Sequence, residues 1–191
     1  MNTSNLNSLK TYRKTAIIVG ILYIIGTISG ILSLSFSDAV RQASNYLGQV
    51  STNESQIIIA ALFILTMGLA LALVPVMMYP ILKRHNQALA MGYVVFRGGL
   101  EATTYILMAV GWLILVPLSQ AYTQATPADA SLWEEISSVL FNGDELGAIL
   151  NIVFCLGAAM FYTVLFRSKI VPRWLSGWGL VALIFYFTSG F

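Results

Sequence analysis

The sequence predicts an all-α protein, a single membrane domain over residues 1–191 that forms a bundle of about five transmembrane helices. Composition is the first reason. Hydrophobic residues make up 58% of the chain and charged residues only 9%, against about 25% in soluble domains. The second reason is that long stretches of the chain contain no charged residues. This pattern excludes a soluble enzyme, a disordered chain and a secreted disulfide scaffold.

The spans follow from length and hydropathy. A helix needs about 20 mainly apolar residues to cross the hydrocarbon core of a bilayer. Only the third of the predicted spans carries charges in its interior. We expect spans at about 15–34, 57–82, 88–118, 145–166 and 176–191.

The two terminal spans raise separate questions. Lys10, Arg13 and Lys14 precede the first span as they would in a signal peptide, but the apolar core is longer than the usual 7–15 residues or so. We therefore expect an uncleaved helix. The fifth span is still apolar at Phe191. We expect it to be incomplete, as in a fragment of a longer protein; the alternative is a helix that ends at the far membrane surface.

The loop over 36–50 shows helical periodicity. Its apolar residues recur at spacings of three and four, which places them on one face of a helix. These residues are Phe36, Val40, Ala43, Leu47 and Val50.

In the second long loop, Ser131 and Glu134 form a capping box, in which each side chain satisfies a free backbone amide of the first turn. Apolar residues follow on one face, and Asn142-Gly143 is a predicted stop. We expect each of the two loops to hold a short interfacial helix on the outer membrane surface, or a connector that hides its apolar side. The second interpretation is favoured.

Charge sidedness predicts the orientation. One side would hold the N-terminus, the turn at 83–87 and the loop at 167–175. The other side would hold Arg41 and most of the acidic residues. Positive charge marks short cytoplasmic loops, so we expect a multi-pass protein of the cell membrane with a cytoplasmic N-terminus. The basic residues on that side are Lys10, Arg13, Lys14, Lys83, Arg84, Arg167, Lys169 and Arg173.

Arg97 and Glu101 are the charges inside the third span. They are four residues apart, so they share one side of a helix. If the helix enters the membrane near Ala88, Arg97 lies about 14 Å deep, near the middle of a core about 30 Å thick. A charge there costs at least about 2.5 kcal/mol. We predict that Arg97 and Glu101 are ligand-binding residues in an inward-facing polar pocket; a structural ion pair is the alternative.

A second frame for this span places the membrane segment at 98–118. Arg97 would then anchor at the interface, and residues 88–96 would lie along the cytoplasmic surface after a bend at Gly98-Gly99. The deeper frame is favoured, because residues 88–96 carry no charge.

No catalytic, metal or cofactor site is predicted. The chain contains one cysteine, Cys155, and one histidine, His85, which permit neither a disulfide nor a thiolate cage. Motifs of hydrolases, metalloproteases and phosphate-binding loops are missing. A net charge of +2 without a basic stripe excludes nucleic acid as a partner.

A stretch after the fourth span, IVPRWLSGWGL over residues 170–180, has interfacial Trp174 and Trp178 one turn apart. It resembles the corresponding segment of an uncharacterised, mainly bacterial membrane family, the domain of unknown function 4386. Further similarity lies in residues 13–23 and 91–101. The resemblance spans most of the chain. It implies a small polytopic protein, commonly with about six helices, and it implies no activity.

Three function classes remain. The first is a protein that binds or moves a small molecule or lipid in a bundle pocket near Arg97 and Glu101. The second is a membrane interaction or sensory subunit that does not transport. A membrane enzyme ranks last. The lipid bilayer is the expected partner in each case.

Overall fold

A computed structural model describes residues 3–41, 43, 45–141 and 144–189 of the chain, and all its elements are helices. The predicted all-α class is therefore confirmed. The elements are α1 (Thr3–Arg41), α2 (Tyr46–Thr52), α3 (Glu54–Leu82), α4 (Gln87–Tyr93), the π-helix η1 (Val94–Leu100), α5 (Glu101–Gln124), α6 (Pro127–Phe141), α7 (Asp144–Ser168) and α8 (Arg173–Ser189).

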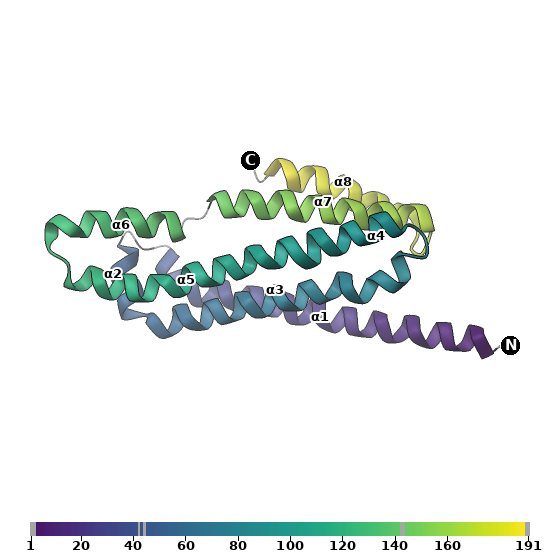
Figure 1. Cartoon of the computed structure of the whole chain (residues 1–191), viewed down its shortest axis with the longest axis horizontal. Helices are drawn as coiled ribbons and strands as arrows, with labels where there is room; N and C mark the ends of the chain where they lie inside the picture. Colours follow the sequence, from purple (N-terminus) through teal and green to yellow (C-terminus); the bar gives the residue numbers. More distant parts are fainter. Residues whose placement is uncertain (1–2, 42, 44, 142–143, 190–191) are drawn as a thin grey trace.

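The long helices lie side by side along the long axis of the molecule (Figure 1). α1 packs along α3, and α3 packs along α5 and η1. On the other side, α7 packs against α4 and η1, and α8 packs against α7. The segment α4–η1–α5 therefore lies between α3 and α7.

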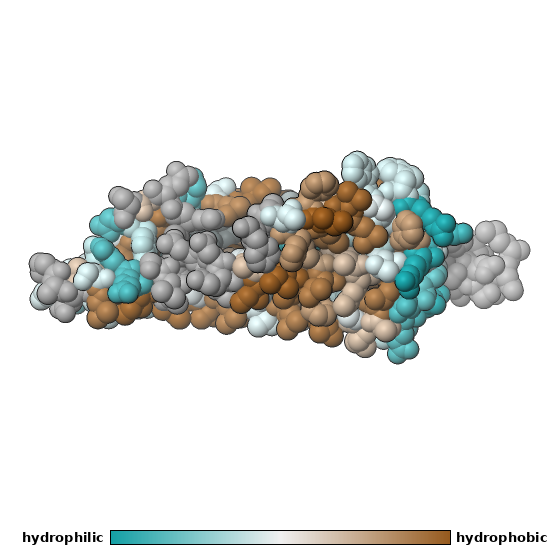
Figure 2. Space-filling view, turned by 90° about the horizontal axis from the view of Figure 1, so that it is seen from above, coloured by the Kyte–Doolittle hydropathy of each residue, from teal (hydrophilic) through white to brown (hydrophobic). Residues whose placement is uncertain are grey.

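Four helical segments of the described part are long and apolar enough to cross a membrane. They coincide with the first four predicted spans, and they indicate a membrane protein. The fifth predicted span corresponds to α8, which has 17 described residues. Figure 2 shows apolar side chains over the middle of the visible surface and polar ones gathered near the ends. The four segments are Tyr12–Val40, Glu54–Leu82, Gln87–Gln124 and Gly147–Ser168.

The loop prediction for 36–50 needs a correction, because these residues do not form one helix. α1 continues to Arg41, and α2 begins at Tyr46. Asn45 is the N-cap of α2, and its Oδ1 accepts a hydrogen bond from the Gly48 amide at 3.0 Å. An asparagine that satisfies a free amide starts a new helix, which apolar periodicity alone does not reveal.

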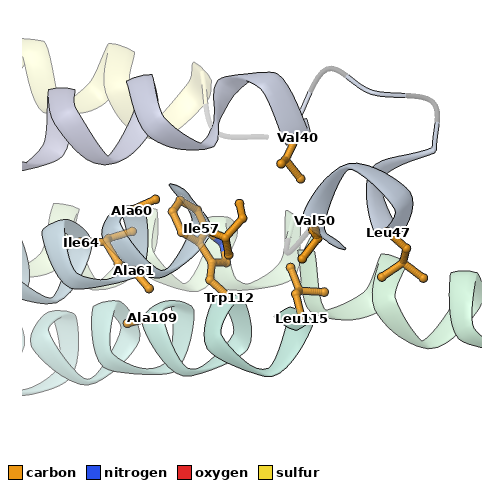
Figure 3. Close-up of a cluster of buried hydrophobic side chains, with 10 residues drawn as sticks. All are labelled: Val40, Leu47, Val50, Ile57, Ala60, Ala61, Ile64, Ala109, Trp112 and Leu115. Carbon is orange, nitrogen blue, oxygen red and sulfur yellow. The ribbon is translucent and has the colours of Figure 1, made fainter. Parts of the chain in front are cut away.

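Three of the five apolar residues of this loop are nevertheless buried in one cluster. Val40, Leu47 and Val50 join side chains of α3 and α5 in one core cluster. Figure 3 shows Val50 of α2 pointing toward Leu115 of α5, and Leu47 of α2 pointing toward the facing helix beside it. α2 therefore closes one end of the bundle and hides its apolar side there.

The helix in the second long loop, α6, begins at Pro127, four residues before the predicted capping box. Proline suits a first helical turn because its missing N–H needs no partner there. Ser131 thus lies inside α6 and is not its N-cap. The predicted stop at Asn142-Gly143 lies outside the described residues.

α6 packs against α5 and is tied to α2. The Tyr46 hydroxyl donates to the Glu134 carbonyl oxygen at 2.9 Å and also contacts the Ser137 hydroxyl. α2 and α6 therefore belong to the same end of the bundle.

Candidate functional site

The two charges predicted to share a helix side form an ion pair. The Arg97 Nη1 lies 2.6 Å from Oε1 and 2.5 Å from Oε2 of Glu101. Arg97 is 8% exposed and Glu101 is 1% exposed. The pair is thus buried within the bundle, and each charge neutralises the other.

A π-helix carries Arg97. The backbone N–H of Glu101 donates to the Phe96 carbonyl, five residues earlier, which is the bond of a π-turn. π-segments are rare and are frequently found at functional sites. The segments before and after Gly98-Gly99 form one continuous helical run (Figure 1). The bend at Gly98-Gly99, which the alternative placement of this span required, is therefore absent.

The Arg97 side chain lies against α7. Its guanidinium carbon is 4.4 Å from the centre of the Phe154 ring, a favourable arrangement of a cation on an aromatic face. Its Cγ also lies so near the backbone of Gly157 that a Cβ there would be 2.5 Å away. One turn of α7 therefore provides both the aromatic face and the space that the arginine occupies.

Glu101 is held from the side of α3. The Tyr105 hydroxyl donates to Glu101 Oε1 at 3.4 Å. The Cβ of Tyr105 approaches Gly68 of α3, where an added Cβ would be 2.7 Å away. A glycine thus brings α3 close to the tyrosine that supports the carboxylate.

Further tyrosine hydroxyls surround the pair. Tyr23 on α1, Tyr93 on α4 and Tyr105 on α5 all interact electrostatically with Arg97. Tyr93 is fully buried and stacks on Phe161 of α7, with ring centres 4.7 Å apart. The site therefore combines one ion pair with the Tyr105 hydroxyl, and Tyr23 and Tyr93 lie near enough to interact with its charge.

Part of the guanidinium remains free. Its hydrogen bonds to described residues all use Nη1. Every fully enclosed side-chain nitrogen or oxygen of the described part has a partner, so Nε and Nη2 of Arg97, which have none, are not completely enclosed. Arginine has five N–H donors, and two of them on one edge match the two oxygens of a carboxylate or phosphate.

Other polar residues of the spans contribute differently. Thr103 and Thr104 donate to carbonyl oxygens of their own helix, at Gly99 and Leu100. Asn151 accepts from Cys155 and donates to the Tyr186 carbonyl of α8 at 3.5 Å. These side chains serve helix packing, whereas Tyr105 belongs to the site.

Sequence reasoning did not identify Tyr23, Tyr93, Phe154 or Gly157. Tyr93 lies four residues before Arg97, a spacing that could have indicated it. The other three lie on α1 and α7, so no local spacing connects them with Arg97. No group of three His, Cys, Asp or Glu side chains in the described ranges is placed to hold a metal ion.

Comparison with known proteins gives one match. The model of a family described as a domain of unknown function (DUF4386) matches residues 18–191, nearly the whole chain. No curated protein and no solved structure matches the chain.

Proposed function

We propose a function from the site itself, because the chain belongs to the DUF4386 family, a domain of unknown function. The proposal is that this membrane protein binds a small molecule bearing a carboxylate or phosphate at the free edge of Arg97. Glu101 holds the guanidinium in place from the other side. Phe154 and Tyr105 fix the orientation of the pair.

The proposed setting is a cell membrane, with α8 as a fifth span and the N-terminus in the cytoplasm. The basic residues at the N-terminus, the α3–α4 turn and the α7–α8 loop support this orientation. α2 and α6 would then lie at the outer interface. In this frame the Arg97–Glu101 pair lies between the two membrane surfaces, where it is within reach of a ligand crossing the bundle.

One observation carries the proposal: a buried arginine uses only Nη1 for its carboxylate partner. A purely structural ion pair would be more stable if the arginine used both edges of its guanidinium. A charge inside a membrane is costly, and N–H donors without a partner do not offset that cost. The free edge offers an anion two parallel charge-assisted hydrogen bonds. The neighbouring Glu101 charge would limit binding to ligands that fit this edge closely.

The test separates the positive charge of Arg97 from the two-donor edge of its guanidinium. Arg97→Lys keeps a cation beside Glu101 but removes the two-donor edge. Wild type and variant would be purified into lipid nanodiscs and titrated with acetate, succinate or inorganic phosphate, with thermal unfolding and calorimetry as readouts. We expect at least one anion to bind wild type, and Arg97→Lys to weaken that binding at least about tenfold, as for a lost charge-assisted contact of 1.5–3 kcal/mol.

Arg167→Lys is the matched control, because this residue lies at the end of α7 and should leave binding unchanged. Equal anion binding by wild type and Arg97→Lys would contradict the proposal. So would the failure of every anion in the series to bind wild type.

A further inference from the structure

A second site lies in a groove at the end of the bundle that holds the α3–α4 turn. The groove has a volume of about 430 Å³ and is lined by Tyr12, Ala16, Met78, Ile81, His85 and Ile170. These residues come from α1, the end of α3, the turn after α3 and the loop before α8. Volumes of about 300–1,000 Å³ are typical of ligand pockets.

The groove has an apolar wall and a polar rim. Ala16, Met78, Ile81 and Ile170 provide hydrocarbon, whereas Tyr12 and His85 provide polar groups. An occupant that fits both parts is an amphiphile with an apolar chain and a polar head.

Arg84 is positioned at the rim. Its Nη1 donates to the Tyr12 hydroxyl at 2.9 Å, and its guanidinium carbon lies 5.7 Å from the centre of the Tyr12 ring. Tyr12 thus lines the groove and holds the arginine beside it. The Arg84 side chain is exposed, so its remaining donors are available to a head group.

The charge around this rim has one sign. Residues 55–100 and 146–191 contain no Asp or Glu. The described acidic side chains other than Glu101 lie elsewhere, at the end of α1, at the start of α3 and in α6; they are Asp38, Glu54, Glu134 and Glu135. Basic side chains of the same end include Lys83 and Lys169. A head group at the rim therefore meets positive charge without a nearby carboxylate.

We propose that this groove binds an anionic phospholipid, with an acyl chain along the apolar wall and the phosphate at Arg84 and His85. Charge complementarity selects this occupant over a neutral lipid, because basic pockets between membrane helices bind anionic head groups. The inference concerns a site separate from Arg97 and does not depend on the function proposed above.

The test measures lipid binding to the full chain. Detergent-purified and delipidated protein would be titrated with phosphatidylglycerol and with phosphatidylcholine of the same chains, and native mass spectrometry would measure the first bound lipid. We expect wild type to prefer phosphatidylglycerol. Arg84→Gln should weaken its binding at least about tenfold, the loss expected for a charge-assisted hydrogen bond. Ala16→Phe, which fills the groove, should weaken the binding of both lipids.

Two controls address charge and bulk. Arg173→Gln removes an arginine that lies over Phe166 and not at the groove, and Ile17→Phe adds bulk to an exposed neighbour of Ala16. Both should retain lipid binding, and circular dichroism checks that all variants fold. Equal binding of the two lipids by wild type would overturn the proposal. Equal losses of phosphatidylglycerol binding in Arg84→Gln and Arg173→Gln would also overturn it. Displacement of the lipid by glycerol phosphate alone would indicate a free-phosphate site and would also overturn it.

Discussion

Arg97 and Gly157 are in direct contact: the arginine Cγ occupies space that a Cβ on residue 157 would enter, at 2.5 Å. The glycine lets α7 and η1 approach closely enough to enclose the guanidinium. The charged pair and the helix crossing therefore depend on each other.

Gly157→Ala should destabilise the protein. The added methyl overpacks the contact with Arg97, and overpacking costs about 1–3 kcal/mol. Gly147→Ala on the same helix meets nothing within 4 Å, so it should be neutral or stabilising by up to about 1 kcal/mol. Denaturant unfolding in mild detergent measures both, and a Gly157→Ala variant as stable as Gly147→Ala would contradict the packing described here.

Removing one charge of the pair should cost more than removing both. Arg97→Gln leaves Glu101 buried without its cation, and Glu101→Gln leaves the arginine without its anion; breaking a buried pair costs about 3–5 kcal/mol. The double variant leaves no unpaired charge, so it should recover part of this loss. A double-mutant cycle on the free energy of unfolding measures the coupling. Additive losses would show that the two charges act independently.

The docking of α2 can be tested at Leu47, which is buried in the core cluster that α2 shares with α3 and α5. Leu47→Ala should destabilise by about 2–5 kcal/mol, as large-to-small core substitutions do. Leu132→Ala on α6, an exposed leucine, is the control and should change stability by about 0.5 kcal/mol or less. Thermal unfolding of both variants decides whether the two leucines differ as their burial requires.

The contact between α2 and α6 predicts a dependence on alkaline pH. Burial raises the pKa of Tyr46 above its ordinary value of 10.0, and the charge of Glu134 raises it further, against a lowering hydrogen bond with Ser137. A group whose pKa is raised in the folded state stabilises the fold fully below its unfolded pKa and loses this contribution as pH rises through its folded pKa.

We therefore expect stability to fall above pH 10 more steeply in wild type than in Tyr46→Phe, which has no hydroxyl to ionise. Unfolding measured from pH 8 to 11 in both proteins isolates the contribution of Tyr46, since the other tyrosines titrate equally in each. Parallel curves would show that the Tyr46 hydroxyl is not buried between the two helices.

The proposed orientation is testable by labelling. In a Cys155→Ser background, Asn45→Cys and His85→Cys place one thiol at each end of the bundle, both at exposed positions. A membrane-impermeant maleimide applied to intact cells should label position 45 and leave position 85 unlabelled until the cells are opened. The reverse pattern would place the N-terminus outside.

Hydropathy and charge spacing predicted the helices and the Arg97–Glu101 pair, because both are properties of neighbouring residues. A run of apolar residues selects a helix wherever the chain lies, and a separation of four residues brings two side chains together within one helix. The start of α2 after its N-cap Asn45 and the π-turn before Glu101 were not predicted, since each depends on one hydrogen bond that apolar periodicity does not encode.

The surroundings of the pair required the tertiary structure. Which residues meet Arg97 depends on how α1, α3 and α7 pack around the α4–η1–α5 segment, and this packing includes close contacts at Gly68 and Gly157. Contacts between segments that are far apart in the sequence leave no periodic trace in one chain. The 9% of charged residues thus predicted where the polar centre lies, whereas the fold decided that one edge of its arginine stays free.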